Sequence, residues 1–154
     1  LNAVEKVNAE QKKVIVSKIT GMFGADLSGK CFAVWGLSFK PGTDDMREAA
    51  SIVIINALIE KGAKIKAYDP KAMREAQTHY FKNQENITYC ENKYEALDSS
   101  DALVLITEWK EFRSPDFERM STLLKQSIIF DGRNQYDKAM LKKYGYEYYQ
   151  IGVK

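Results

Sequence analysis

The sequence predicts an α/β protein with a doubly wound, mostly parallel sheet of about six strands, preceded by a helix. After Gly29, short apolar runs alternate with helical stretches, which is the pattern of repeated strand–helix–strand units. The first run, Cys31–Leu37, is almost wholly apolar, as expected of a parallel strand buried on both faces. A chain of 154 residues has the usual length of one domain.

The expected elements follow in a regular order. A helix over Asn2–Gly21 has apolar residues at spacings of three, four and seven, and we expect it to lie outside the strand–helix unit, as a linker. The strands are expected at Cys31–Leu37, Ala63–Tyr68, Ile87–Cys90, Ala102–Thr107, Ile128–Asp131 and Tyr146–Ile151. The intervening helices are expected at Asp45–Lys61, Lys71–Lys82, around Asn92–Leu97, Asp116–Leu124 and Asp137–Tyr144. This alternation predicts a Rossmann-like topology.

The helix expected over Asp45–Lys61 has clear start and stop signals. Thr43 or Asp44 can cap its first turn, and Gly62 stands where a glycine usually ends a helix. Its wide apolar face predicts that it packs on the sheet.

Composition excludes several functions. Lys and Arg total 23 against 21 Asp and Glu, so the net charge of +2 argues against nucleic-acid or membrane-surface binding. The two cysteines are far apart and His79 is the one histidine, so no Cys/His zinc cluster can form. No apolar run approaches a membrane span, and Leu1–Lys13 does not resemble a signal peptide. We therefore expect a soluble, cytoplasmic domain.

In a doubly wound sheet, ligands bind beyond the carboxyl ends of the strands. The segment after the first strand, Gly36–Glu48, holds two glycines, Lys40, Arg47 and an expected helix start, a combination that favours phosphate. It is neither a P-loop nor a GxGxxG fingerprint. A solvated loop that leads into a capped helix is the alternative.

Three further strand ends reach the same edge. Asp69 follows the second strand, where an acidic residue binds ribose in dinucleotide sites or else caps a turn. Trp109 belongs to the segment after the fourth strand, and Arg133 follows the fifth. Arg133 at a tight Gly turn suits anion recognition, and a surface ion pair with Asp131 is the alternative.

Five motifs together make a family resemblance. They are Gly36–Ser51 (GLSFKPGTDDMREAAS), Tyr68–Pro70 (YDP), Thr107–Trp109 (TEW), Phe130–Asn134 (FDGRN) and Tyr149–Gly152 (YQIG). In this order they resemble the C-terminal domain of UDP-glucose 6-dehydrogenases and their UDP/GDP-sugar dehydrogenase relatives. Glu5–Gln11 resembles the end of the central helix in that family. The resemblance implies a boundary, with 1–24 as the end of the connecting helix and 25–154 as the UDP-sugar-binding domain.

The resemblance also implies an activity. The enzymes of this family oxidise the C6 hydroxyl of UDP-glucose to a carboxylate by two hydride transfers to NAD. By this resemblance Phe39, Lys40 and Arg133 would contact the UDP-sugar, with Trp109 beside the uridine pocket. Arg47 would reach the NAD pyrophosphate across the cleft between the domains.

Departures from the family pattern limit what this chain can do. It has no GxGxxG, and neither Cys31 nor Cys90 stands in the Gly-rich loop of the family's catalytic cysteine. We therefore expect the catalytic cysteine upstream of Leu1, in an N-terminal domain of the same enzyme, and no turnover by this chain alone. The family implies a homodimer. UDP-N-acetyl-mannosamine or GDP-mannose dehydrogenase and a non-catalytic nucleotide-binding module are the alternatives.

Overall fold

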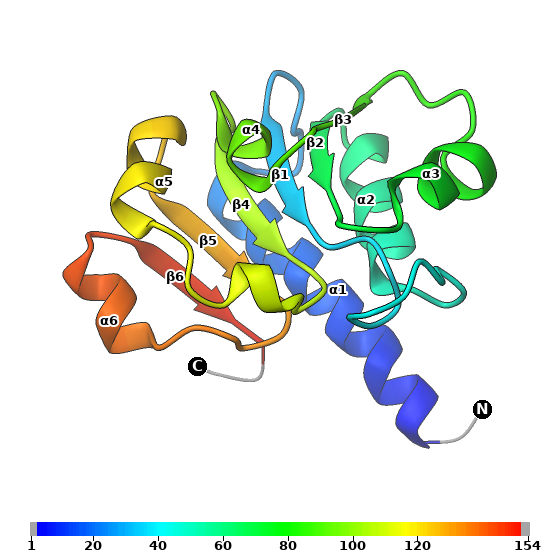
Figure 1. Cartoon of the computed structure of the whole chain (residues 1–154), viewed down its shortest axis with the longest axis horizontal. Coiled ribbons are helices and arrows are strands. Elements are labelled where there is room, and N and C mark those ends of the chain that lie inside the picture. Colours follow the sequence, from blue (N-terminus) through cyan, green and yellow to red (C-terminus); the bar gives the residue numbers. More distant parts are fainter. Residues whose placement is uncertain (1–2, 152–154) are drawn as a thin grey trace.

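The structure, a computed structural model, describes residues 3–151, with side chains from Lys12 onward. Figure 1 shows one sheet with helices packed around it. The elements before the middle of the chain are α1 (Ala3–Phe23), β1 (Cys31–Trp35), α2 (Ala50–Glu60), β2 (Lys64–Tyr68), α3 (Met73–Glu75), the π-helical turn η1 (Ala76–Tyr80) and β3 (Ile87–Tyr89). The later elements are α4 (Lys93–Leu97), β4 (Ala102–Leu105), the 3-10 turn η2 (Lys110–Phe112), α5 (Phe117–Leu123), β5 (Ile128–Asp131), α6 (Lys138–Lys143) and β6 (Glu147–Gln150).

The six strands form a single sheet in the order β3-β2-β1-β4-β5-β6. Every neighbouring pair is parallel. The predicted fold class is therefore confirmed, and the strand order is that of the Rossmann fold. The order reverses between β1 and β4, so the loops after these strands flank the switch point where doubly wound proteins bind ligands.

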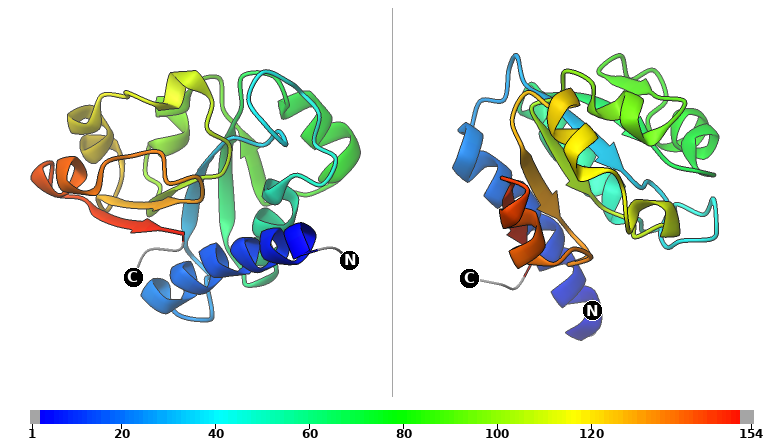
Figure 2. Two further views of the ribbon diagram at one scale, coloured as in Figure 1. Left: turned by 90° about the horizontal axis from the view of Figure 1, so that it is seen from below. Right: turned by 60° about the vertical axis from the view of Figure 1, so that its left-hand side comes forward.

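Two apolar layers sandwich the sheet. Figure 2 shows α1 and α2 on one side of the strands and α4 and α5 on the other. On the first side, Ile19, Ile55 and Leu58 pack with Phe32 and Phe130. The opposite layer is built from alternate strand residues and from the short helices after β3 and β4; it contains Ala33, Trp35, Leu97, Leu103, Leu105, Phe112, Met120 and Ile129. Burial on both faces explains why the central strands lack polar alternation.

The leading helix belongs to the packed unit along its second half. Ile15 and Ile19 are almost completely buried in the layer that contains α2 and β5. The helix expected outside the strand–helix unit therefore packs against that unit from Lys12 onward, and its role as a linker stays a prediction. The helix also continues through Gly21 to Phe23, and it ends at Gly24, whose φ of 94° is unfavourable for other residues. Val4 and Val7, expected on its apolar face, lie outside the described side chains.

The helix expected over Lys71–Lys82 is shorter and changes type. It begins as α3 and continues as the π-helical turn η1. His79 lies on this turn, is exposed, and has its Nε2 3.8 Å from Glu75 Oε2. The interpretation of His79 as a surface residue is confirmed.

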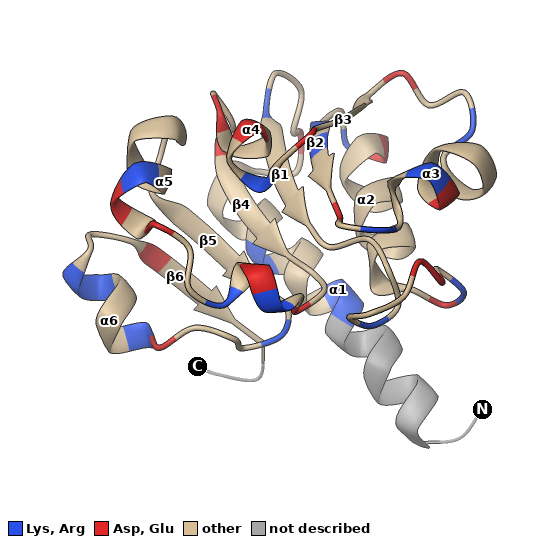
Figure 3. Cartoon of the chain, viewed as in Figure 1, with Lys and Arg blue, Asp and Glu red and all other residues tan. Residues whose placement is uncertain are grey.

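Charged residues are distributed over the surface rather than concentrated. Figure 3 shows basic and acidic segments interspersed along the coloured part of the chain. No helix among the described residues is long and apolar enough to cross a bilayer. In the same part of the chain, no group of three or more His, Cys, Asp or Glu residues could hold a metal ion.

Candidate functional site

The loop after β1 starts with a close approach to the neighbouring strand end. Gly36 has a φ of 97°, and a Cβ added to it would lie 2.5 Å from both Cβ and N of Thr107. Only glycine therefore fits here, because any other side chain would collide with the backbone after β4. Next to it, the Thr107 hydroxyl donates to the Ser38 carbonyl at 2.7 Å, and the Ser51 hydroxyl donates to the Leu37 carbonyl at 2.6 Å. This part of the loop is held from two other elements.

Asp69, the residue after β2, also holds the loop after β1. Its side chain is 1% exposed and its Oδ2 accepts hydrogen bonds from the backbone N–H of Leu37 at 2.7 Å and of Ser38 at 3.0 Å. Its Oδ1 accepts from the N–H groups of Lys71 and Ala72, both at 2.8 Å. The cap-and-turn interpretation of Asp69 is confirmed, and the carboxylate also links two strand ends.

Beyond Ser38 the loop turns outward. Phe39 is 55% exposed, which is unusual for a large apolar side chain, and Lys40 is exposed beside it. The backbone remains fixed, because the Ser38 hydroxyl donates to the Lys40 carbonyl at 2.9 Å and the Phe39 N–H donates to the Asp45 carbonyl at 2.8 Å. Both predicted substrate contacts are therefore presented to solvent on an ordered loop.

The helix start expected at Asp45 is wrong, because α2 begins five residues later at Ala50. Local side-chain bonds compete with the helix: Thr43 Oγ1 accepts from the Asp45 N–H at 3.1 Å, and Asp45 Oδ1 accepts from the Arg47 N–H at 2.9 Å. Glu48 then takes a left-handed φ of 59°. The N-cap is Ala49, without a side-chain cap, so neither Thr43 nor Asp44 caps the helix.

The stop of α2 agrees with the prediction. Lys61 is the C-cap, and Gly62 follows with a φ of 103°. The N–H of Ala63 donates to the Leu58 carbonyl at 3.1 Å, which satisfies a carbonyl of the last turn.

Arg47 is paired within its own loop. Its Nη2 lies 2.7 Å from Asp45 Oδ2, and its Nε donates to both oxygens of the same carboxylate, at 3.1 and 3.2 Å. The guanidinium lowers the pKa of Asp45 to about 2, and the carboxylate raises the pKa of Arg47, in both cases chiefly through these hydrogen bonds. The Arg47 side chain is 83% exposed, so the pair is open to exchange with a ligand anion.

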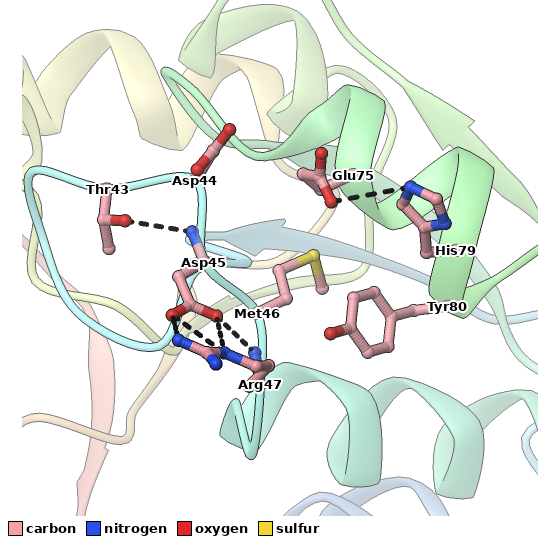
Figure 4. Close-up of a pocket in the computed structure, with 8 residues that line it drawn as sticks. All are labelled: Thr43, Asp44, Asp45, Met46, Arg47, Glu75, His79 and Tyr80. Atoms are coloured by element: carbon pink, nitrogen blue, oxygen red, sulfur yellow. Dashed lines mark hydrogen bonds and ion pairs between the residues drawn. The ribbon is translucent and has the colours of Figure 1, made fainter.

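An open hollow of about 710 Å³ lies next to this pair, between the loop after β1 and the α3–η1 segment. Figure 4 shows Arg47 turned back onto Asp45, with Glu75 and His79 on the opposite wall. The remaining lining residues are Thr43, Asp44, Met46 and Tyr80. Asp44, Asp45 and Glu75 make this lining acidic, so Arg47 is the group in it that suits phosphate.

Arg133 projects from the loop after β5. Its Nε donates to Glu108 Oε2, in a pair whose side chains are 50% and 28% exposed. The ion pair with Asp131, the alternative considered from the sequence, is wrong: Asp131 is fully buried, and only the backbone N–H of Arg133 donates to it, at 2.8 Å. Glu108 takes that role because it lies in the loop after β4, the strand adjacent to β5.

Asp131 holds the Arg133 loop as Asp69 holds the Lys40 loop. Its Oδ2 accepts from the Gln135 N–H at 2.7 Å, from the Tyr136 N–H at 3.1 Å and from the Tyr148 hydroxyl at 2.6 Å. Burial raises the pKa of Tyr148, and the bond to Asp131 adds to the shift. The hydroxyl therefore stays protonated and remains a donor.

Trp109 lies inward. The ring is 9% exposed within the second apolar layer, and its Nε1 donates to Asp69 Oδ2 at 3.0 Å. Its predicted place beside a uridine stays a prediction. The structure adds a different contact, because Trp109 ties the loop after β4 to the loop after β2.

The strand order brings the predicted residues to one edge of the sheet. Lys40, Trp109 and Arg133 follow β1, β4 and β5, which are adjacent in the sheet. Sequence reasoning assigned no role to Ser38, Thr107 or Glu108. Their position directly after apolar strands is the signal that could have indicated one, since it is the signal that singled out Trp109 and Arg133.

Comparison with known proteins gives this edge a context. The family model of the UDP-glucose/GDP-mannose dehydrogenase family, UDP binding domain, matches residues 33–138, which include all four loops described above. The chain belongs to this family. A UDP-glucose 6-dehydrogenase of Pseudomonas aeruginosa is 40% identical over 154 residues, covering 99% of this chain and 34% of that protein. One from Rhizobium meliloti is 40% identical over 146 residues, covering 95% of this chain and 32% of that protein.

Solved structures of dehydrogenases share the fold. A UDP-glucose dehydrogenase from the archaeon Pyrobaculum islandicum superposes with a TM-score of 0.74 at 28% identity, over 97% of this chain and 31% of that one. A GDP-mannose dehydrogenase from Pseudomonas aeruginosa, solved as a ternary complex, gives 0.64 at 22% identity, over 97% and 33%. The chain thus spans about a third of the length of these relatives.

Proposed function

We propose that this chain is the UDP-sugar-binding domain of an NAD-dependent UDP-glucose 6-dehydrogenase. The observation that carries the proposal is the loop after β1, which presents Phe39 and Lys40 outward at the switch point, in a chain 40% identical to such an enzyme. Lys40 and Arg133 would supply positive charge for the phosphates of a nucleoside diphosphate, and Phe39 would supply an apolar contact surface. Trp109 lies just behind them.

The reaction requires parts that this chain does not supply. The complete enzyme would oxidise UDP-glucose to UDP-glucuronate by two successive hydride transfers to NAD, using a cysteine upstream of this segment. Residues 1–24 would end the connecting helix, and 25–154 would form the domain that binds the nucleotide and closes the cleft. The enzyme would work as a cytoplasmic homodimer.

We expect this domain to contact only one face of NAD. The chain has no GxGxxG, and the hollow beside Arg47 is lined by three carboxylates, so it cannot hold a dinucleotide alone. Arg47 fits a contact to the NAD pyrophosphate, because its guanidinium is exposed and its partner Asp45 is an exchangeable surface carboxylate. NAD supplies the hydride acceptor when bound, and Arg47 would help to orient it from this side.

Calorimetric titration of the complete enzyme tests the substrate class. We expect UDP and UDP-glucose to bind more tightly than GDP, GDP-mannose or UDP-N-acetyl sugars. Tight binding of GDP without a response to UDP would contradict the proposal and favour the GDP-mannose branch. Binding of UDP without any NADH formation would favour a non-catalytic nucleotide-binding module.

A variant of Lys40 tests the site. Lys40→Ala should raise the KM for UDP-glucose and weaken UDP binding about tenfold or more, since a charge-assisted contact to phosphate is lost. Lys64→Ala is the matched control, because Lys64 is an exposed lysine at the opposite end of the strands. Equal KM values for the two variants would remove Lys40 from the site.

A further inference from the structure

The Asp69 carboxylate makes more contacts than a turn requires. Its Oδ1 alone caps the turn after β2, by accepting from Lys71 and Ala72. Its Oδ2 is directed elsewhere, to the N–H groups of Leu37 and Ser38 and to the indole of Trp109. One buried oxygen therefore joins loops that follow β1 and β4, far apart in sequence.

The first branch from Oδ2 leads to Lys40. Ser38, held by Asp69 through its N–H, bonds the Lys40 carbonyl through its hydroxyl at 2.9 Å. The Ser38 carbonyl in turn accepts from Thr107 at 2.7 Å. Every polar group of Ser38 is thus used to fix the backbone next to Lys40.

The second branch leads to Arg133. Trp109 donates to Asp69, and the residue before it, Glu108, contacts the Arg133 guanidinium. The turn between them is tight, because the Trp109 N–H donates to the Thr107 carbonyl at 2.9 Å. Displacement of the indole would therefore move the carboxylate that orients Arg133.

We propose that Asp69, together with the Trp109 indole bonded to it, is a positioning residue that sets the spacing of Lys40 and Arg133 for a diphosphate. The inference rests on the function proposed above. Asp69 cannot be a ligand contact itself, because it is 1% exposed and an anion would repel phosphate. It acts by holding two cations in a fixed arrangement before the ligand arrives, which lowers the entropy cost of binding.

Indole N–H resonances of the ¹⁵N-labelled chain provide the test. The sequence has two tryptophans, and the Trp35 Nε1 donates to the Lys93 carbonyl at 2.9 Å rather than to Asp69. On titration with UDP, the Trp109 indole signal should shift and saturate, and it should shift more than the Trp35 signal, whose indole is bonded to Lys93. Shifts of the backbone amides of Leu37–Lys40 give the Kd, even when binding is weak.

Three variants separate positioning from stability. Asp69→Asn and Trp109→Phe should each raise the Kd for UDP about tenfold. Trp109→Phe perturbs the packing less, because it keeps an aromatic ring. Asp101→Asn is the matched control: Asp101 is 5% exposed and its Oδ2 accepts from the Cys31 N–H at 2.8 Å, at the opposite edge of the sheet. Its Kd should stay within about twofold of the parent value.

The outcomes are distinct. The Trp35 indole signal shows whether the Trp109→Phe variant is folded. If the folded variant binds UDP as tightly as the parent does, the positioning role is wrong while the proposed function stands. A loss of UDP affinity for Asp101→Asn as large as that for Trp109→Phe would also overturn the positioning role. Failure of the parent chain to bind UDP, tested up to millimolar concentration, would overturn both proposals.

Discussion

Two kinds of carboxylate stand at the carboxyl edge of the sheet. Asp69 and Asp131 are 1% and 0% exposed, and within the described residues neither makes an ion pair; backbone N–H groups, an indole and a phenol surround them. Asp45 and Glu108 are partly exposed, and each holds an arginine. Buried carboxylates fix the backbone, whereas the surface carboxylates pair with exposed arginines.

The physical reason for the difference is solvation. Burying a carboxylate without hydrogen-bond donors costs several kcal/mol of folding free energy. The hydrogen bonds to Asp69 and Asp131 therefore persist as long as the protein is folded. A surface ion pair contributes about 0–1 kcal/mol, so phosphate can replace the carboxylate at little cost. The predictions below test this division, from the largest expected effect to the smallest.

Removal of a buried carboxylate should have the largest effect. Asp69→Ala leaves five hydrogen-bond donors without their acceptor, and we expect the free energy of unfolding to fall by about 3–5 kcal/mol. Urea denaturation followed by circular dichroism measures this. A loss below about 1 kcal/mol would mean that water satisfies these donors, and the distinction between the two kinds of carboxylate would fail.

The Tyr148 hydroxyl should contribute less to stability than the Asp69 carboxylate at neutral pH, and its contribution should be lost in alkali. Tyr148→Phe removes one donor to Asp131 and should cost about 1–2 kcal/mol at pH 7. Because burial raises the pKa of Tyr148 above its unfolded value, its contribution is complete below about pH 10 and is lost as the pH rises further.

Urea unfolding between pH 7 and pH 11 checks this sign. The parent should lose stability above pH 10, and Tyr148→Phe should lose less over that interval. Tyr136 and Tyr146 also have raised pKa values through burial, so part of the decline should remain. Parallel curves for the parent and the variant would contradict the assignment.

Replacement of a surface carboxylate should leave the fold intact. Glu108→Gln keeps the shape of the side chain but removes the charge that faces Arg133, and we expect the free energy of unfolding to change by less than about 1 kcal/mol. The same urea measurement, compared with Asp69→Ala, gives the contrast directly. A loss equal to that of Asp69→Ala would show that this pair is structural.

The smallest effect concerns the pair in the loop after β1. Arg47 lowers the pKa of Asp45 to about 2, so the interaction is present above about pH 4 and is lost as the pH falls toward 2. Arg47→Gln should return the pKa toward its ordinary value with only a small change in thermal stability, because the pair is exposed to solvent. Carboxyl ¹³C chemical shifts during an acid titration report it. An ordinary pKa in the parent would mean that the pair does not form in solution.

The sequence alone predicted the Rossmann-like fold class and the sheet edge at which we propose that the ligand binds. Apolar runs such as Cys31–Leu37 and Ala102–Thr107 specify buried parallel strands, because a backbone buried on both sides leaves no place for polar side chains. Strand ends then follow from where the apolar runs stop, so Lys40, Trp109 and Arg133 could be placed on one edge from the sequence. The motifs at these ends also identified the family.

Only the tertiary structure decided which partner each side chain takes. The helix start at Ala50 depends on bonds from Thr43 and Asp45 that outcompete helix formation, and spacing alone does not rank these. The sequence allowed an ion pair between Arg133 and Asp131. In the structure Asp131 is buried against Tyr148, and Arg133 pairs with Glu108 from the loop after β4. Periodicity specifies which face of a strand is buried, because that depends on local alternation. Contacts between loops depend on the sheet order that brings them together, and so they emerge only once the chain is folded.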